Sequence, residues 1–285
     1  MTVWLNGDWR EGAGAIDAAD RGFLLGDGAF ETVYVACGRC AFWPQHAARL
    51  RRGLETLRIP APAALDAVPA IVAALARRGG LAGKTAAARV TVSRGPGPRG
   101  LFPPQTAAPT MLVSLSAYEA PRAPARLVIA ARRRFSAGAA NGFKAIGGYL
   151  DSMLALAEAR QAGADDAVML NEQGGVACAT AANIFVIGAD GALVTPRIED
   201  GAMPGVVRGL VLAAAPSLGL RAAEKEISAA ALADGFVFLT NSLIGLRPAG
   251  LGDGPPSPKA EEIFRALLSC YQRRLEEASA QEGPA

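Results

Sequence analysis

The amino-acid sequence predicts a mixed α/β protein that is divided into two domains. Its 285 residues are about twice the length of a common single domain. Runs rich in β-branched and aromatic residues alternate along the chain with segments whose apolar residues recur at helical spacing. The segment 119–125 interrupts both patterns with two prolines, so it predicts a linker between a small α/β domain, 1–118, and a larger α/β domain, 126–285.

The first domain is expected to begin with a hairpin and to contain a second one. Asn6-Gly7-Asp8 is typical of a tight turn, with a return strand that starts at Trp9, and Gly38-Arg39 is typical of a two-residue turn. Two helices should follow, because apolar residues recur there at helical spacing. In chain order we expect strands 3–5, 30–36 and 40–43, helices 44–57 and 63–78, and strands 89–93 and 110–115.

The second domain mixes strands and helices in the same way. An irregular segment rich in Gly, Ala and Asn separates its first strand from its first helix. In chain order we expect strand 126–131, helix 149–162, strands 167–171, 183–188 and 193–195, helix 205–215, strand 235–239 and helix 259–277.

Composition excludes several classes of function. With 51% hydrophobic and 19% charged residues, the chain falls among packed globular proteins rather than disordered ones. The 29 basic and 26 acidic residues leave a formal charge of +3, and the basic residues form only short runs, so no nucleic-acid partner is expected. The single histidine, His46, argues against a multi-histidine metal site, and we expect no metal.

The cellular location follows from what the sequence lacks. The first residues do not resemble an export signal, and no apolar stretch has the length of a membrane span. Four cysteines are far below the density of a disulfide scaffold, so reduced thiols are expected. We therefore expect a cytoplasmic protein with a small-molecule substrate and no membrane partner.

Two short motifs favour structural interpretations. The run Gly95-Pro-Gly-Pro-Arg-Gly100 has the glycine spacing of a dinucleotide site, but its prolines lack the N–H groups that such a site aims at phosphate. We interpret it as a loop between strands that carries Arg94 and Arg99, either solvated or facing an anionic ligand. Cys37 and Cys40 could form half a zinc site or a redox pair, but they flank the expected turn and are better interpreted as strand residues.

Lys144 is a candidate for Schiff-base chemistry. The neighbouring lysines in the sequence are Lys84 and Lys225, and the residues that flank Lys144 are apolar. Apolar surroundings lower the pKa of an amine, which makes it nucleophilic, although a lysine with a solvated amine would show the same pattern. Tyr149 follows closely, and a helix that starts near Gly205 could hold a phosphate. A lysine, a phenol and a phosphate cradle are the parts of a pyridoxal phosphate site.

Segments along nearly the whole chain support this interpretation. They are 20–32 (Asp-Arg-Gly-Phe-Leu-Leu-Gly-Asp-Gly-Ala-Phe-Glu-Thr), 46–50, 144–150 (Lys-Ala-Ile-Gly-Gly-Tyr-Leu), 171–176, 182–185, 195–196, 204–208 (Pro-Gly-Val-Val-Arg) and 239–242 (Leu-Thr-Asn-Ser). Together they resemble the fold-type IV pyridoxal phosphate enzymes, which include aminodeoxychorismate lyase, D-amino acid aminotransferase and branched-chain aminotransferase. The resemblance implies two α/β domains with the cofactor in the cleft between them, the larger domain being the cofactor-binding one, and a homodimer.

The same resemblance assigns roles to individual residues. Lys144 would carry the cofactor as a Schiff base and act as the catalytic base, and Tyr149 would bond the phenolic oxygen of the cofactor. His46 would be a structural partner on the helix that carries Arg49. The residues expected to hold the phosphate are Arg49, the backbone N–H groups of Val206 and Val207, and the Asn241 and Ser242 turn. Arg89 and Arg99 stand where relatives bind a substrate carboxylate.

Cys178 departs from the family pattern. Relatives have a glutamate at this position, which pairs with the pyridine nitrogen of the cofactor and keeps it protonated. A thiol with an ordinary pKa near 8.5 does not provide a permanent counter-ion, so the cofactor should be a weaker electron sink. Transamination depends on that sink more than an elimination that ends in an aromatic product does. The remaining alternatives are loss of activity, or a Glu172 that reaches in from the preceding turn.

The resemblance therefore favours a 4-amino-4-deoxychorismate lyase that forms p-aminobenzoate and pyruvate for folate biosynthesis. The run 240–248 is more similar to the lyases than to the branched-chain enzymes. An aminotransferase of D-amino or branched-chain amino acids is the alternative: Arg99 fits the D-amino acid enzymes, but Leu101 occupies a place where they tend to have histidine. A non-catalytic ligand-binding or interaction protein that has lost the glutamate is the alternative from another class.

Overall fold

The computed structural model describes residues 2–12, 16–251 and 257–280 and has the expected mixed α/β character. The chain forms two compact units, each drawn from more than one stretch of sequence. Unit 1 comprises residues 1–119, 143–148 and 275–285, and unit 2 comprises residues 120–142 and 149–274. Lys144 thus belongs to unit 1 with the short segment 143–148, whereas the residues before and after that segment belong to unit 2.

Unit 1 is built on a six-stranded sheet with the order β2-β1-β6-β5-β3-β4, and every pair in it is antiparallel. The strands are β1 Thr2–Leu5, β2 Asp8–Glu11, β3 Gly28–Ala36, β4 Arg39–Cys40, β5 Thr85–Ser93 and β6 Thr110–Ala117. The long central pair, β3 and β5, runs in register from Gly28 opposite Ser93 to Ala36 opposite Thr85. Glu31 lies on β3 and Arg89 on β5.

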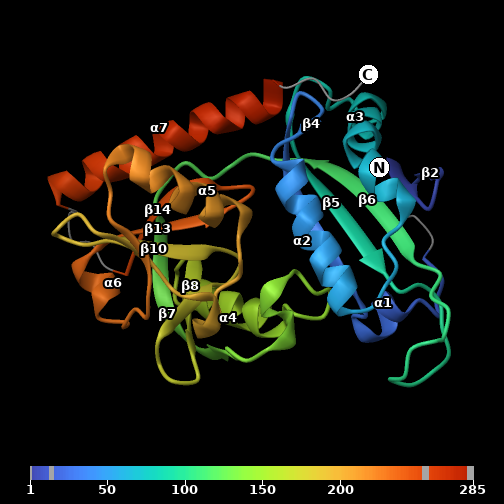
Figure 1. Cartoon of the computed structure of the whole chain (residues 1–285), viewed down its shortest axis with the longest axis horizontal. Coiled ribbons are helices and arrows are strands. Elements are labelled where there is room, and N and C mark those ends of the chain that lie inside the picture. The colour runs from blue at the N-terminus through green and yellow to red at the C-terminus, as the bar shows by residue number, and fades with distance from the viewer. Residues whose placement is uncertain (1, 13–15, 252–256, 281–285) are drawn as a thin grey trace. The chain divides into compact units, whose positions relative to one another are not determined.

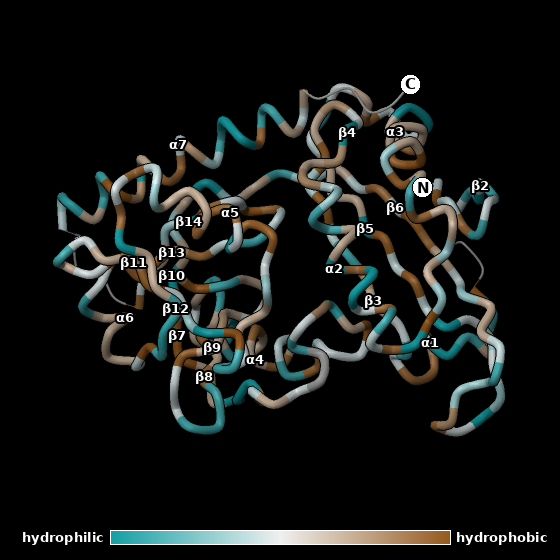
Figure 2. The backbone as a smooth tube through the Cα atoms, viewed as in Figure 1, coloured by the Kyte–Doolittle hydropathy of each residue, from teal (hydrophilic) through white to brown (hydrophobic). Residues whose placement is uncertain are grey.

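Two helices of unit 1 supply the apolar residues that pack on the sheet (Figure 1). They are α2, Trp43–Thr56, and α3, Val68–Arg78, which follows a 3-10 turn at Ala63–Ala67. Leu50 and Leu54 of α2 and Val72 of α3 are buried with Val33 and Val90 of the sheet. Figure 2 shows the hydrophobic colouring along β5 and β6 that this packing requires. The periodicity of the sequence had predicted both helices.

The second hairpin differs from its expectation. The return strand β4 ends at Cys40 and does not extend to Trp43, because Trp43 begins α2 with a proline in its first turn. Cys37 and Gly38 form the turn, with φ angles of 50° and 76°, rather than Gly38 and Arg39. The short helix α1, Arg21–Leu25, was not expected, and its N-cap is Asp20, whose side chain accepts a hydrogen bond from Gly22 N–H.

Unit 2 contains an eight-stranded mixed sheet with the order β12-β11-β10-β13-β14-β7-β8-β9. The strands are β7 Ala125–Arg134, β8 Asp166–Asn171, β9 Val176–Ala179, β10 Asn183–Ile187, β11 Leu193–Thr195, β12 Ala222–Glu224, β13 Phe236–Asn241 and β14 Gly245–Gly250. The helices are α4 Leu150–Gln161, α5 Val206–Ala214, α6 Ala231–Asp234 and α7 Pro258–Ala280, of which residues 275–280 belong to unit 1.

Strands β9, β12 and β14 were not expected from the sequence. Strands β9 and β12 are short, and β14 contains glycine and proline, which strand propensity disfavours. The parallel pairs are β7 with β8, β14 with β7, and β11 with β12. Among the described residues, no helix combines the length and the apolar character that crossing a bilayer requires.

Candidate functional site

The segment that carries Lys144 forms a short extension of the sheet in unit 1. Phe30 N–H donates to Lys144 O over 2.9 Å, and Ile146 N–H donates to Gly28 O over 3.0 Å. The ring of the buried Phe143 packs closely on Gly53 of α2, where a larger residue would not fit. Two backbone hydrogen bonds and one buried ring therefore fix the backbone on both sides of Lys144.

Lys144 and Arg89 lie against the same aromatic ring. The Nζ of Lys144 is 5.4 Å from the centre of the Phe30 ring, and the guanidinium carbon of Arg89 is 3.7 Å from it. Both are cation–π contacts, which hold a cation without neutralising its charge. One of the two arginines expected to bind a substrate carboxylate therefore lies near the expected catalytic lysine, within a single unit.

Arg49 is held in a buried charge cluster with Glu31 and His46. Its Nε and Nη2 each donate to a carboxylate oxygen of Glu31 over 2.7 Å. His46 Nδ1 lies 2.7 Å from the same carboxylate, and all three side chains are nearly inaccessible to solvent. Arg49 and His46 lie one helical turn apart on α2, as the sequence had indicated, but Glu31 was not predicted from the sequence. The sequence does place Glu31 within an apolar strand, and a charge buried there requires a partner, so this pattern could have indicated an ion pair.

The three side chains of the cluster carry one negative and one positive charge at neutral pH. Burial alone would raise the pKa of Glu31, but hydrogen bonds from Arg49 and His46 outweigh it and lower the pKa to about 2. Burial lowers the pKa of His46, and the charges of Arg49 and Lys144 also lower it. The hydrogen bond to Glu31 and the charge of Glu31 oppose this shift in the pKa. His46 is therefore neutral and donates its Nδ1 proton to Glu31 while Arg49 keeps its charge.

The segment between β5 and β6 is a loop, as predicted, but the prediction for one of its two arginines is wrong. Arg94 is neither solvated nor facing a ligand, because it is buried and donates to Asp27 over 2.7 and 3.1 Å and to the carbonyls of Leu57 and Arg58. Arg99, in contrast, is exposed to solvent. Of the two arginines in the loop, only Arg99 stays a candidate for a ligand.

Unit 2 contains the residues that the sequence assigned to a phosphate cradle other than Arg49, which belongs to unit 1. Helix α5 begins at Val206, and no side chain caps its first turn. A side chain at Gly205 would collide with Asn183 Oδ1, so the helix start lies directly against β10. Asn183 is opposite Thr240 in the pairing of β10 with β13. The first N–H groups of α5 and the end of β13 therefore lie in one region.

The side chains of Thr240 and Asn241, at the end of β13, differ in their hydrogen bonding. Asn241 Oδ1 accepts from the N–H groups of Leu243 and Ile244, both over 2.9 Å, so this side chain fixes the turn that contains Ser242. Thr240 Oγ1 is buried and has no hydrogen-bond partner among the described residues. A buried hydroxyl without a partner is costly, and an anion bound here would accept its proton. Thr240 was not predicted from the sequence.

Cys178 lies in an apolar environment in unit 2. Its half-buried side chain packs against small residues of α4 and β8, and α4 begins directly after Tyr149. Burial raises the pKa of the Cys178 thiol to about 11, against a smaller opposing effect of the Arg134 charge. The thiol is therefore neutral at pH 7. Glu172 does not replace the missing carboxylate, because its exposed side chain accepts hydrogen bonds from the backbone and hydroxyl of Ser136.

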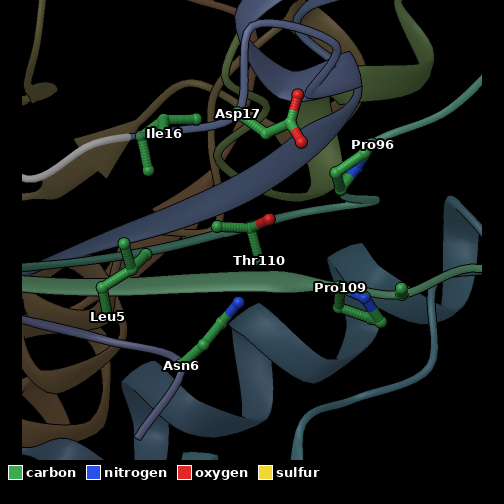
Figure 3. A pocket seen from close by; sticks show the side chains of 8 residues that line it. Leu5, Asn6, Ile16, Asp17, Pro96, Pro109 and Thr110 are labelled. Atoms are coloured by element: carbon green, nitrogen blue, oxygen red, sulfur yellow. The ribbon is translucent and has the colours of Figure 1, made fainter. Parts of the chain in front are cut away.

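Other candidate features have structural explanations. Cys37 and Cys40 are free thiols, the first in the β3–β4 turn and the second in β4. Among the described residues, no group of three or more His, Cys, Asp and Glu side chains is placed to hold a metal ion. A shallow pocket of about 410 Å³ in unit 1 is shown in Figure 3. Two of its polar side chains already accept hydrogen bonds of 2.7 Å from the backbone, Asn6 from Met111 N–H and Asp17 from Ala19 N–H.

Comparisons with known proteins agree with this arrangement. A family model described as amino-transferase class IV matches residues 28–250. A Methanocaldococcus jannaschii protein named as a branched-chain-amino-acid aminotransferase is 28% identical over 235 residues, 80% of this chain and 79% of that protein. An aminodeoxychorismate lyase of Vibrio harveyi is 28% identical over 270 residues, 91% of this chain and 95% of that protein.

A solved structure extends the likeness to the fold. The crystal structure of 4-amino-4-deoxychorismate lyase from Pseudomonas aeruginosa has a TM-score of 0.77 at 28% identity, covering 94% of this chain and 98% of that one. The chain belongs to the amino-transferase class IV family. It is thus a pyridoxal phosphate-dependent enzyme of fold type IV, as the sequence had predicted, and not a non-catalytic protein.

Each unit, taken by itself, contains residues that suit one part of this cofactor. Its phosphate requires hydrogen-bond donors, and unit 2 provides an uncapped helix start beside the unsatisfied hydroxyl of Thr240. Its aldehyde requires an amine, and unit 1 holds Lys144 in a fixed backbone against the Phe30 ring. Its pyridine nitrogen would face a neutral thiol if it lay against Cys178.

Proposed function

We propose that this enzyme is a 4-amino-4-deoxychorismate lyase that forms p-aminobenzoate and pyruvate, the former serving folate biosynthesis. The observation that carries this proposal is the neutral Cys178 where the family has a glutamate. The lyase relatives support it, because their similarity to this chain extends over more than nine-tenths of its length.

Lys144 is the catalytic residue of the proposed reaction. When bound, pyridoxal phosphate supplies an electron sink for a carbanion next to the substrate nitrogen. With the cofactor bound, the free amine of Lys144 would take the proton from the ring carbon that bears the substrate nitrogen and would deliver it to the three-carbon unit that leaves as pyruvate. The carbon–oxygen bond of the ether breaks, and the ring becomes aromatic, so atoms and electrons balance.

Other residues would bind and orient. We propose that Arg49, Val206, Val207, Asn241 and Ser242 hold the cofactor phosphate, Arg49 through its side chain and the two valines through backbone N–H groups. Tyr149 would bond the phenolic oxygen, and Arg89 and Arg99 would bind substrate carboxylates. The contact of Arg89 and Lys144 with one ring supports the role of Arg89. The buried, unpartnered hydroxyl of Thr240 adds a further phosphate donor.

A product assay tests the activity. The loaded enzyme should convert 4-amino-4-deoxychorismate into equal amounts of p-aminobenzoate and pyruvate, measured by chromatography. The Lys144→Ala variant is the control and should form neither product. Formation of new amino acids from 2-oxoglutarate with L- or D-amino acid donors, without lyase activity, would overturn the assignment in favour of an aminotransferase. An aminotransferase is the second candidate because the Methanocaldococcus relative has the same 28% identity to this chain as the Vibrio lyase.

Substitution of Cys178 is expected to affect aminotransferase and lyase activity differently. Cys178→Glu would place a carboxylate near the Arg134 charge that already acts on the thiol, and it should raise the pKa of a neighbouring pyridine nitrogen. Cys178→Gln is the matched control, because it has the same size without the charge. We expect single-turnover transamination at least about tenfold faster in the Glu variant than in the Gln variant, with a smaller change in the lyase rate. Equal rates in two folded, cofactor-loaded variants would contradict the proposal.

We also propose that the enzyme is a homodimer that works in the cytoplasm. Unit 1 exposes large apolar side chains on α1 and on the loop before β6: Phe23 at 76%, Leu24 at 53%, Leu101 at 85% and Phe102 at 85% exposure. Patches of this kind mark interaction sites. Analytical ultracentrifugation should show a dimer that Phe23→Lys weakens, and a monomeric parent protein would contradict this proposal. The free cysteines suit a reducing compartment.

A further inference from the structure

Arg21, the first residue of α1, is buried beneath the loop that carries Arg99. Only 3% of its side chain is accessible to solvent. Its Nη1 donates to the carbonyl of Gly100 over 2.9 Å and to that of Pro98 over 3.4 Å, and its Nη2 donates to the carbonyl of Leu101 over 3.0 Å. These carbonyls lie on both sides of Arg99 in the sequence, so one guanidinium binds the backbone before and after it.

The Arg21 side chain is itself fixed. Its Nε donates to Asp27 over 2.8 Å, and Asp27 also accepts from Arg94. The hydrogen bonds from both arginines lower the pKa of the Asp27 carboxyl although burial opposes them. The aliphatic part of Arg21 lies so close to Gly97 that a Cβ there would be 2.8 Å from Arg21 Cδ. The planar fork of donors is therefore held in one orientation by a charged partner and by packing.

The backbone of the same region joins the loop to the start of α1. Arg21 N–H donates to Gly95 O over 3.0 Å, and Gly97 N–H donates to Ala19 O over 3.2 Å. Ser93 Oγ donates to Asp20 Oδ2 over 2.9 Å. The first half of the loop is thus fixed by backbone bonds, whereas the bonds from Arg21 are the side-chain contacts that reach Gly100 and Leu101.

We infer that Arg21 is a positioning residue, which holds the loop so that Arg99 can bind the substrate carboxylate. This inference rests on the proposed role of Arg99 in substrate binding. An exposed arginine on a loose loop would lose conformational entropy on binding a carboxylate, and a loop already fixed at both flanks of that arginine reduces this loss. Arg21 contacts the loop backbone and would act only through Arg99.

Arg21→Lys is the variant that tests the inference, and Arg94→Lys is its matched control. A lysine at position 21 keeps a positive charge beside Asp27 but loses the fork that reaches three carbonyls, while Arg94 remains to pair with Asp27. Arg94 shares the same carboxylate, but its carbonyl partners are Leu57 and Arg58, outside the loop. A loss of stability common to both variants is therefore subtracted by the comparison.

Two measurements on the loaded enzyme are needed. An arginine-specific protease should cut the Arg99–Gly100 bond at least about fivefold faster in Arg21→Lys than in the parent or in Arg94→Lys, as followed by mass spectrometry. KM for the carboxylate substrate should rise about fivefold or more in Arg21→Lys, with kcat and the cofactor dissociation constant unchanged. A purely structural role would not separate KM from kcat in this way.

Each contrary result has a different meaning. Equal cleavage of Arg99–Gly100 in the two lysine variants would overturn the inference, because Arg21 would not hold the loop. Faster cleavage with an unchanged KM would also overturn it, and an Arg99→Gln variant then identifies the cause. If Arg99→Gln also leaves KM unchanged, the proposed substrate role of Arg99 has failed. If it raises KM, Arg99 binds substrate without help from Arg21.

Discussion

The buried cluster of Glu31, His46 and Arg49 makes a quantitative prediction about the variant Glu31→Gln. The carboxylate accepts three hydrogen bonds of 2.7 Å in a site without solvent access. A glutamine of the same size offers one acceptor oxygen and turns an amide donor toward other donors. It also leaves the Arg49 charge buried without a counter-ion, which is among the most destabilising changes in a protein interior.

The size of the effect follows from the pKa of Glu31. Its fall from 4.5 to about 2 on folding corresponds to about 3 kcal/mol of stability at neutral pH. Because the pKa is lowered in the folded state, this contribution is present above pH 4.5 and is lost as the pH falls toward 2. We therefore expect the free energy of unfolding of Glu31→Gln to be about 3 kcal/mol below that of the parent at pH 7, and the difference to shrink by about 1 kcal/mol at pH 3.5.

Urea denaturation followed by tryptophan fluorescence at both pH values measures this difference. Glu55→Gln, at an exposed position of α2, is the control and should change stability by less than about 0.5 kcal/mol. The reasoning is wrong if Glu31→Gln loses less than about 1 kcal/mol at pH 7, or if its deficit is the same at both pH values.

Three further experiments test the proposed cofactor contacts. Borohydride reduction and peptide mapping should locate the pyridoxyl group on Lys144, and recovery of the label on Lys84 or Lys225 would refute that assignment. Arg49→Lys keeps the charge beside Glu31 but loses the bidentate geometry, so cofactor affinity measured by fluorescence titration should fall about tenfold; unchanged affinity would exclude Arg49 from the phosphate site. Thr240→Val should leave the cofactor-free protein as stable as the parent or more so, since it removes an unsatisfied buried hydroxyl, and should weaken cofactor binding about tenfold; a loss of stability without a change in affinity would contradict this role.

Hydrophobic periodicity was sufficient to predict most of the fold because it reports which face of an element is buried. Helix α2 and the strand β11 agree with their expected bounds to within one residue. Strand β14 escaped prediction because Gly245, Pro248 and Gly250 give it the composition of a loop. Its strand geometry comes from pairing with β13, which is a tertiary effect that local propensity does not contain.

Candidate site residues could be predicted from the sequence where the chemistry requires a particular residue type. They could not be predicted where their position depends on tertiary packing. Lys144 was conspicuous because an isolated lysine among apolar residues is unusual. The return of residues 143–148 to unit 1 was not visible, because it depends on Phe143 meeting Gly53 far away in the sequence. Thr240 gave no signal at all, since only the three-dimensional structure shows that its hydroxyl is buried without a partner.

Strand β3 directs the Glu31 carboxylate and the Phe30 ring to opposite faces of the sheet in unit 1. Successive residues of a strand point to opposite faces, so Glu31 faces α2 with Val33 and Val35, while Phe30 faces the other side with Arg89 and Lys144. The carboxylate that neutralises Arg49 is thereby directed away from the ring that supports Lys144. Displacing β3 by one residue would exchange the two faces and would bring the carboxylate to the amine. An ammonium paired with a carboxylate has a raised pKa and is a poor nucleophile, so the register of β3 with β5 is a condition for the chemistry proposed for Lys144 as well as for the core.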